Sequence, residues 1–332
     1  MFLSMLLVLL RIYGDGTDLF FSRVLGEICF VLLSESGFGP KLYGVWGEGR
    51  LEEWLELRTL APEEMKYPAV STSISHQVAQ LHTMHMPFDK TPVILFNCRQ
   101  WLAKSEFIAQ KYVPGVVLSD ENILSAGDTM ALVKHNFNEQ EQDWLKEFFG
   151  YGLREEYNWL LNEILSNVRT PIVFAHNDLQ AGNIMCNEQD EVKLIDFEYG
   201  NYNFLCYDLA NHFAEWLFDY QGVEEWPYYS VSMDQWPDLD TQRTFVTEYL
   251  AERHRILKKP QLASLQKIKR YLKDINRLVL ASHFQWSTWS VIQASMSKID
   301  FPYLEFGLRR FEVYLKMKKA LPETLKAIDA LQ

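Results

Sequence analysis

The sequence predicts an α+β fold with a small mixed N-terminal lobe and a large, mainly helical C-terminal lobe. Residues 1–56 alternate strand-like and helix-like patterns, whereas beyond Pro62 apolar residues recur mostly at helical spacing. Two short apolar strands near residues 171–174 and 192–196 interrupt the helical part, and each runs into a polar cluster. With 332 residues, 48% of them hydrophobic, the chain can build a full core, which excludes a largely disordered protein.

The apolar run over residues 1–10 has two interpretations. It is too short to span a bilayer, which needs about 20 residues. A signal peptide would carry a basic region before the run and a small-residue cleavage site after it, whereas Arg11 follows here. We therefore expect a buried strand over residues 6–13, with a signal sequence as the weaker alternative. No other run in the sequence is long enough to cross a membrane, so we expect no stable membrane insertion.

The rest of the N-terminal lobe is expected to be a helix and a hairpin. Helical spacing over residues 18–36 ends at a Gly and Pro cluster. Two short strands over 42–46 and 51–55 are joined by Gly47 and its neighbours, a hairpin signal.

The C-terminal lobe, residues 57–332, is expected to begin with a helix over 70–84. An amphipathic helical stretch over 140–167 and an almost wholly helical tail from about 240 follow the same spacing, and 113–140 has the mixed composition of an irregular insertion.

Charge and cysteine usage limit the partners. The net charge of −12, from 32 Lys and Arg against 44 Asp and Glu, argues against nucleic acid, since phosphate binding needs a basic surface. An acidic chain suits a cationic or metal-bridged ligand, although solubility alone also explains it. Cys29, Cys98, Cys186 and Cys206 form no close pair, which predicts free thiols in a reducing, cytoplasmic compartment.

The stretch from residue 176 to 199 contains the candidate catalytic and metal-binding side chains. Asp178 follows an apolar strand, Asn183 lies five residues further on, and Asp196 ends a second apolar strand. A hairpin between the strands would bring these side chains to one rim. Two carboxylates and an amide oxygen suit Mg²⁺ carried on nucleotide phosphates, and phosphoryl transfer needs such a set. The alternative is a pair of polar turns with capping Asp and Asn.

The pattern His-x-Asp-x-x-x-x-Asn at 176–183, followed by a strand and Asp-Phe-Glu at 196–198, resembles the catalytic and metal loops of the protein-kinase-like fold. The wider resemblance is to the choline/ethanolamine kinase family, nearer its choline branch. It is carried by residues 39–43, 176–183, 196–199, 202–203, 208–216 and 281–290, and runs from about residue 6 to about 315. It implies a two-lobed, aminoglycoside-phosphotransferase-like fold whose small N-terminal lobe is truncated.

The resemblance implies a role for each matching residue. Asp178 would be the catalytic base, with Asn183 and Asp196 as Mg²⁺ ligands and Glu198 beside them. Arg11 would meet the nucleotide phosphates. The stretch from Glu53 to Leu55 would form the hinge beside adenine. His176, Asp208 and His212 are expected to brace the loops.

The substrate choice rests on aromatic residues. A quaternary ammonium has no hydrogen to donate, so proteins hold it mainly on aromatic faces. Trp286 and Trp289 lie three apart on one helical face, although packing alone also explains that spacing. The resemblance places Gln180, Tyr199, Tyr220 and Phe306 in the same pocket, and the family often has Tyr where Phe306 stands. We expect ATP-dependent formation of phosphocholine for phosphatidylcholine synthesis, with ethanolamine as the alternative substrate.

Departures from the family pattern predict a third possible function, besides a choline kinase and an ethanolamine kinase. Family members carry a Gly/Ser-rich turn over the ATP phosphates before the Arg11 strand, and only residues 1–5 precede that strand here. One expectation is therefore a catalytically weak form that pairs with a longer family member. The other is that Met1 is an alternative start and the natural protein is longer. Gly26 stands where the family has a Glu, so Glu27 would have to replace it. A homodimer is also compatible with the family. His76, His82 and His85 on one helix suggest packing or solvation more than a metal site.

Overall fold

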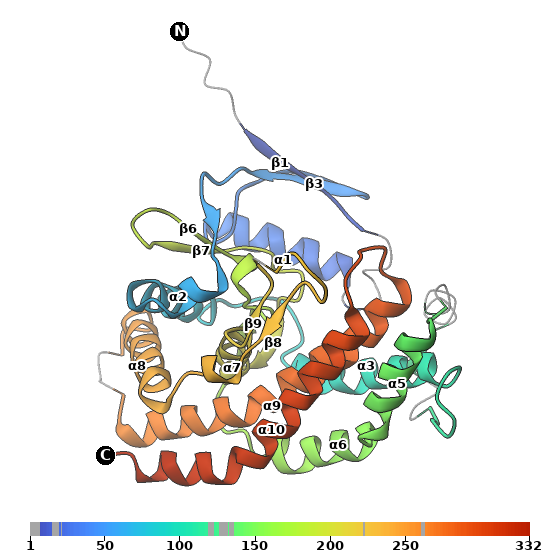
Figure 1. The fold of residues 1–332 in the computed structure, drawn as a ribbon. Coiled ribbons are helices and arrows are strands. Elements are labelled where there is room, and N and C mark those ends of the chain that lie inside the picture. The colour runs from blue at the N-terminus through green and yellow to red at the C-terminus, as the bar shows by residue number, and fades with distance from the viewer. Residues whose placement is uncertain are drawn as a thin grey trace.

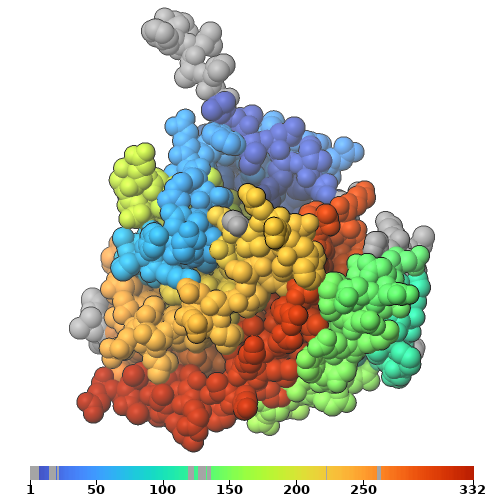
Figure 2. All heavy atoms as spheres, in the orientation of Figure 1, coloured from blue at the N-terminus to red at the C-terminus, as the bar shows by residue number. Residues whose placement is uncertain are grey.

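The computed structural model describes residues 7–14, 20, 22–118, 123–125, 132, 136–221, 223–259 and 263–332. The N-terminal lobe lies above a larger helical lobe in Figure 1, and Figure 2 shows it as a blue cap over the yellow, orange and red parts of the chain. Its elements are β1 (Val8–Ile12), α1 (Arg23–Glu35), β2 (Leu42–Trp46) and β3 (Gly49–Glu53). The predicted boundary at residue 56 falls between β3 and the next strand.

The N-terminal sheet has the strand order β1-β3-β2 and is antiparallel throughout. The hairpin prediction is confirmed, but β3 begins at Gly49, because Gly49 already pairs with Trp46 across a two-residue turn. A Cβ at Gly49 would lie 2.4 Å from the Arg11 carbonyl oxygen. A side chain there would push β1 away, so this glycine helps to set the position of Arg11.

Strand β1 is where predicted, but its predicted burial is wrong. Val8, Leu10 and Ile12 are 41%, 55% and 62% exposed. The physical reason is that β1 lies at the edge of the three-stranded sheet, where an apolar run has no second layer to cover it. The helix predicted over 18–36 is α1; Ser22 caps it by accepting a hydrogen bond from the Leu25 amide at 3.4 Å. Residues 18 and 19 lie outside the described part.

The C-terminal lobe holds the remaining elements. Its strands are β4 (Arg58–Thr59), β5 (Ile172–Ala175), β6 (Ile184–Cys186), β7 (Val192–Leu194), β8 (Asn201–Phe204), β9 (Phe218–Asp219) and β10 (Ser230–Val231). Its helices are α2 (Pro68–Leu81), α3 (Val93–Ala109), α5 (Glu139–Gly150), α6 (Leu153–Trp159), α7 (Leu205–Glu215), α8 (Leu239–Ile256), α9 (Leu265–Met296) and α10 (Tyr303–Ala330). Short 3-10 or π turns fill Pro62–Lys66, Leu160–Ile164, Leu165–Asn167, Ala181–Asn183 and Met233–Gln235.

Strand pairing differs from the prediction. The two apolar strands that flank the polar cluster, β5 and β7, do not form a hairpin with each other. Strand β5 pairs with β8, and β7 pairs with β6 in the sheet β4-β6-β7. The hairpin partner of β7 is the short strand directly after Asn183, so the loop after β5 and the loop after β7 reach one place from two separate sheets.

The helical predictions hold with one break. The stretch predicted over 140–167 divides into α5 and α6 at Gly152, whose φ of 72° lies in the left-handed region that favours glycine. The tail from residue 239 onward is α8, α9 and α10 as predicted. Of the predicted insertion over 113–140, much lies outside the described residues. Within the described part of the chain, no helix is both long and apolar enough to cross a bilayer.

Helix α7 lies at the centre of the C-terminal lobe and positions the site. Every residue from Leu205 to Glu215 is buried. Helices α9 and α10 pack along each other beneath it in Figure 1. All four cysteines are buried and unpaired, as the sequence predicts.

Candidate active site

The loop after β5 is held by the buried carboxylate of Asp208 on α7. Its two oxygens accept hydrogen bonds from the backbone amides of His176 and Asn177, both at 2.7 Å. His82 adds a third contact at 3.0 Å between its Nε2 and Asp208. Ionised Asp208 is thereby favoured, and its pKa is lowered although burial alone would raise it. The predicted bracing role of Asp208 is confirmed.

Asn177 takes the strained conformation that turns the loop. Its φ of 69° is left-handed, which Asn tolerates better than most residues. Its side-chain amide donates to the carbonyls of Tyr199 and Asn201 at 2.9 and 3.2 Å, and its Oδ1 accepts from Asn203 at 2.8 Å. These contacts tie the catalytic loop to the start of β8.

His176 joins the two functional loops, as predicted. Its Nε2 lies 2.9 Å from the Ile195 carbonyl, and its Nδ1 accepts the Asp178 amide at 3.3 Å. Its pKa is lowered by burial, so the ring stays neutral. His212 plays a similar part, with its Nδ1 3.3 Å from the Leu179 carbonyl.

Asp178 and Asn183 meet directly. The Asn183 side-chain amide donates to the Asp178 carbonyl and to its Oδ2, both at 2.9 Å. Burial raises the pKa of Asp178 well above its usual value, and repulsion from Glu215, Glu198 and Asp196 adds to the rise. Asp178 therefore lies in an acidic, buried environment that favours its protonated form.

Asp196 is held by Arg11 of β1. The two terminal nitrogens of Arg11 contact the two carboxylate oxygens of Asp196 at 2.8 and 3.1 Å. Glu52 lies 3.5 Å from the Arg11 Nε, so β3 supplies the second acidic partner. Glu27 lines a cavity of about 240 Å³ together with Arg11, while the described ion pairs of Arg11 go to Asp196 and Glu52. Asp196 itself has a left-handed φ of 61°.

The donor set fits a nucleotide-bound Mg²⁺ and not a closed protein cage. Among the described residues, no three His, Cys, Asp or Glu side chains converge as a metal cluster. Mg²⁺ is usually bound by one or two carboxylates, with substrate phosphates and water completing its shell. Asp196, Glu198 and the Asn183 amide offer such a partial set. Burial, and after it the negative charge of Asp196, raises the pKa of Glu198 to about 7. A bound cation would favour the ionised form of this carboxylate.

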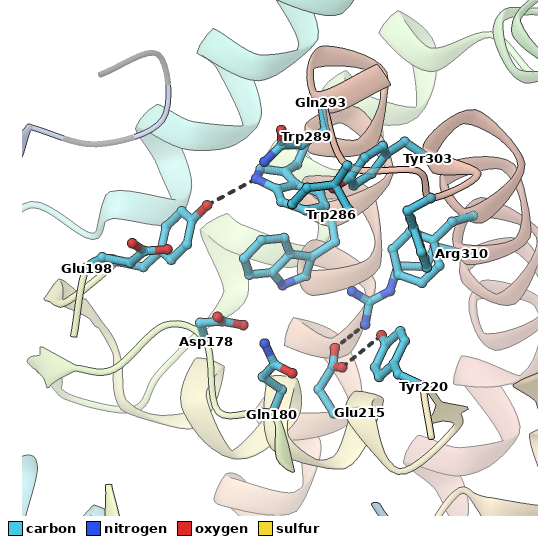
Figure 3. Close-up of a pocket in the computed structure, with 14 residues that line it drawn as sticks. Asp178, Gln180, Glu198, Glu215, Tyr220, Trp286, Trp289, Gln293, Tyr303 and Arg310 are labelled. Carbon is cyan, nitrogen blue, oxygen red and sulfur yellow. Dashed lines mark hydrogen bonds and ion pairs between the residues drawn. The ribbon is translucent and has the colours of Figure 1, made fainter. Parts of the chain in front are cut away.

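A cavity of about 360 Å³ opens beside Asp178. Seven aromatic side chains line it, and Figure 3 shows several of them around the acidic groups. The structure brings together there Asp178, Glu198 and all six predicted substrate residues: Gln180, Tyr199, Tyr220, Trp286, Trp289 and Phe306.

The rings of this aromatic pocket pack against one another at steep angles. The ring centres of Trp286 and Trp289 are 5.4 Å apart at 80°. Trp289 donates from its Nε1 to the Tyr199 hydroxyl at 3.0 Å, which fixes its orientation. On the other side, Tyr220 and Phe306 are 6.0 Å apart. The wall therefore presents ring faces and edges to the cavity.

Sequence reasoning missed other residues of the pocket wall. Buried Glu215 accepts a hydrogen bond from Tyr220 at 3.1 Å and is paired with buried Arg310. The resemblance used Glu215, with Gln180 and Trp216, to favour the choline branch but gave it no place in the pocket. Arg310 had no signal except its position four residues after Phe306 on one helix face. The further wall residues are Gln293, Ile299, Phe301 and Tyr303.

A smaller cavity of about 130 Å³ lies under the N-terminal sheet. Its wall includes the predicted nucleotide residues Arg11, Glu53 and Leu55 together with Asp196. Apolar side chains complete it from both lobes: Leu9, Phe30, Met185 and Ile195. This cavity, called the slot below, thus combines apolar walls with an arginine and a carboxylate.

The comparisons with known proteins agree on one family. Residues 4–315 match the choline/ethanolamine kinase family. A choline/ethanolamine kinase of Rattus norvegicus is 36% identical over 329 residues, which cover 96% of this chain and 74% of the rat protein.

Solved structures show the same fold. A choline kinase from Cryptosporidium parvum has a TM-score of 0.74 at 23% identity, over 97% of this chain and 84% of that one. An ethanolamine kinase from Plasmodium vivax has a TM-score of 0.69 at 21% identity, over 92% and 75% of the two chains. With its two apolar strands, paired loops and aromatic pocket, this chain belongs to the choline/ethanolamine kinase family and has the two-lobed protein-kinase-like fold.

Proposed function

We propose that this chain is an ATP-dependent choline kinase, which transfers the γ-phosphoryl group of ATP to the choline hydroxyl. The observation that carries the proposal is the aromatic cavity that opens onto Asp178. Family membership supports phosphoryl transfer to an amino alcohol, and the rat relative is named for choline and ethanolamine together. The product, phosphocholine, would feed phosphatidylcholine synthesis.

The pocket chemistry favours choline over ethanolamine. Trp286, Trp289, Tyr220 and Phe306 offer aromatic surface to a cation that has no hydrogen to donate. The ammonium of ethanolamine has three N–H donors, so it would need hydrogen-bond acceptors where the pocket has aromatic rings. The Tyr199 hydroxyl already accepts from Trp289, and Glu215 is already paired.

Asp178 would accept the proton of the substrate hydroxyl as oxygen attacks phosphorus. Its raised pKa fits a general base, because a carboxylate with a pKa nearer neutrality takes a proton more readily. Asn183 holds Asp178 in place through two hydrogen bonds. Asn183, Asp196 and Glu198 would hold Mg²⁺ with the nucleotide, where it neutralises phosphate charge.

The test measures ADP formation from ATP and Mg²⁺ with choline and with ethanolamine in parallel. We expect choline-dependent turnover that falls by roughly 10²–10⁴-fold in Asp178→Asn. Trp289→Ala should raise the KM for choline far more than that for ethanolamine. Wild-type turnover retained by Asp178→Asn would exclude this residue as the base.

Two other outcomes separate the alternatives. Faster turnover with ethanolamine would identify an ethanolamine kinase, which the family also contains. A folded protein without turnover on either amine, but with activity in a mixture with a longer family member, would favour the weakly active partner form. Light scattering on the same samples reports whether this chain forms the dimer that we expect from its family.

A further inference from the structure

Arg310 is a buried cation in the wall of a pocket that we propose binds a cation. Its side chain comes from α10 and is 2% exposed. The guanidinium carbon lies 4.5 Å from the ring centre of Phe218 and 5.3 Å from that of Phe306. Two aromatic faces therefore hold Arg310 in position, and Figure 3 shows its guanidinium directed at Glu215.

Glu215 has one hydrogen-bond donor on each of its carboxylate oxygens. One of its oxygens is bound by the Arg310 Nη2, and the other accepts the Tyr220 hydroxyl at 3.1 Å. The residue is 5% exposed, so little water competes for these contacts. The negative charge of Glu215 is matched by the positive charge of Arg310, and both of its oxygens have donors.

This arrangement separates two kinds of ammonium ligand. A primary ammonium needs hydrogen-bond acceptors to replace the water it loses, and an unpaired buried donor weakens binding strongly. A quaternary ammonium needs only aromatic surface and a modest negative field. The rings remain available to the quaternary ligand, while one carboxylate of the wall, Glu215, already has a donor on each oxygen.

We propose that Arg310 is a specificity-determining residue, which favours a quaternary over a primary ammonium by occupying Glu215. The inference rests on the proposed function, since it concerns the choice between two amines at the same pocket. Arg310 acts through Glu215 and the rings and is not assigned to the phosphoryl transfer itself. Removing it would free a carboxylate for the three N–H donors of ethanolamine.

The experiment compares kcat/KM for choline and ethanolamine, together with binding of each amine by calorimetry without nucleotide. In Arg310→Met we expect the choline-to-ethanolamine ratio to fall at least about tenfold, because one charge-assisted hydrogen bond changes affinity by roughly that factor or more. Arg310→Lys should keep the ratio close to wild type. The matched control is Arg309→Met, since Arg309 is the neighbouring residue whose ion pairs go to Glu305 and Glu312.

Two more variants keep the test decisive if Arg310→Met fails to fold. In the double variant Arg310→Met with Glu215→Gln, both charges are gone, and we expect a ratio near wild type. Glu215→Gln alone leaves the Arg310 charge facing the ligand and should weaken both amines by similar factors. A selective loss of ethanolamine in Glu215→Gln would overturn the proposal, since Glu215 would then already serve that amine.

The outcomes distinguish this inference from the proposed function. If the wild-type protein phosphorylates neither amine, the proposed function fails, and the two binding affinities still test the role of Arg310. If the wild-type protein phosphorylates choline and folded Arg310→Met keeps the wild-type ratio, the inference fails and the proposed function stands.

Discussion

Arg11 forms an ion pair with Asp196, the carboxylate that the nucleotide-bound metal would need as a ligand. Both oxygens of Asp196 are contacted by its guanidinium, so a metal ion and Arg11 compete for the same atoms. Arg11 also lines the cavity suited to the nucleotide. Nucleotide phosphates offer Arg11 an alternative anion, and its release would free Asp196. In the proposed function, Arg11 would therefore link nucleotide binding to metal binding.

This competition predicts how the metal binds when no nucleotide is present. In Arg11→Met, Mn²⁺ should bind about fivefold more tightly than in the wild type, since a partly exposed ion pair is worth roughly 1 kcal/mol. ADP affinity should fall in the same variant. Electron paramagnetic resonance of free Mn²⁺ measures the first effect. In the double variant Arg11→Met with Asp196→Asn, the increase in Mn²⁺ affinity should be absent. If the increase remained, the metal would be bound by residues other than Asp196.

At the residue scale, the sequence could predict the polar residues of the candidate site but not all the residues that form the wall of the aromatic pocket. Asp178 and Asp196 could be predicted because each comes shortly after a short apolar strand, and Asn183 because it lies five residues after Asp178, a spacing typical of one chemistry. Arg310 could not be predicted, because an arginine on a helix usually lies in solvent. Its burial depends on Glu215, about a hundred residues earlier in the chain.

At the element scale, α7 holds the loop after β5 through two side chains, Asp208 and His212, and Asp208 makes the greater number of contacts. Asp208 accepts two backbone amides of that loop and contacts His82 on the far side. A buried amide without an acceptor costs about 1–3 kcal/mol. The loop geometry therefore depends on α7 more than on the strand that precedes it.

Replacing Asp208 by Ala should destabilise the fold and slow the reaction. Two orphaned amides predict a loss of roughly 2–6 kcal/mol in the free energy of unfolding. Urea denaturation measures the loss, and kcat should fall because the loop before Asp178 is no longer held. Asp240→Asn is the control, since the Asp240 side chain is 76% exposed and pairs only with Arg243 nearby. Equal stability of the two variants would contradict the bracing role.

The spacing of apolar residues predicted where helices and strands lie better than it predicted which strands pair with each other. Helices α2, α8, α9 and α10 follow from apolar spacing, because that spacing reflects a neighbouring core. The partner of β5 was predicted wrongly, since β8 supplies it from nearly thirty residues later and no local signal selects that strand. The burial of β1 was also wrong, because position within a sheet is a property of the other strands.

At the scale of the whole molecule, the buried histidines make stability depend on pH. His82, His176, His212 and His283 are buried, and burial lowers the pKa of each. The pKa of His212 falls to about 4 from its ordinary 6.5. Unfolded histidine therefore binds a proton in a range where the folded one does not, and acid favours unfolding.

The stability contributed by neutral His212 should be fully present above pH 6.5 and lost as pH falls toward 4. The loss amounts to roughly 3 kcal/mol, because one pKa unit corresponds to about 1.4 kcal/mol. Thermal melts between pH 8 and pH 5 should show Tm falling with acid. His212→Gln should flatten that slope, and His85→Gln at the surface should not. A Tm independent of pH over this range would rule out neutral buried histidines.

The two cavities described above also bear on the stereochemistry at phosphorus. The aromatic pocket has Asp178 in its wall, and the slot beneath the N-terminal sheet has Asp196. In the proposed reaction the amine and the nucleotide would each occupy one cavity, and the γ-phosphorus would lie between the two carboxylates with the attacking and leaving oxygens in line. A single displacement of this kind inverts the configuration at phosphorus, whereas relay through a phosphorylated side chain would invert it twice and restore it.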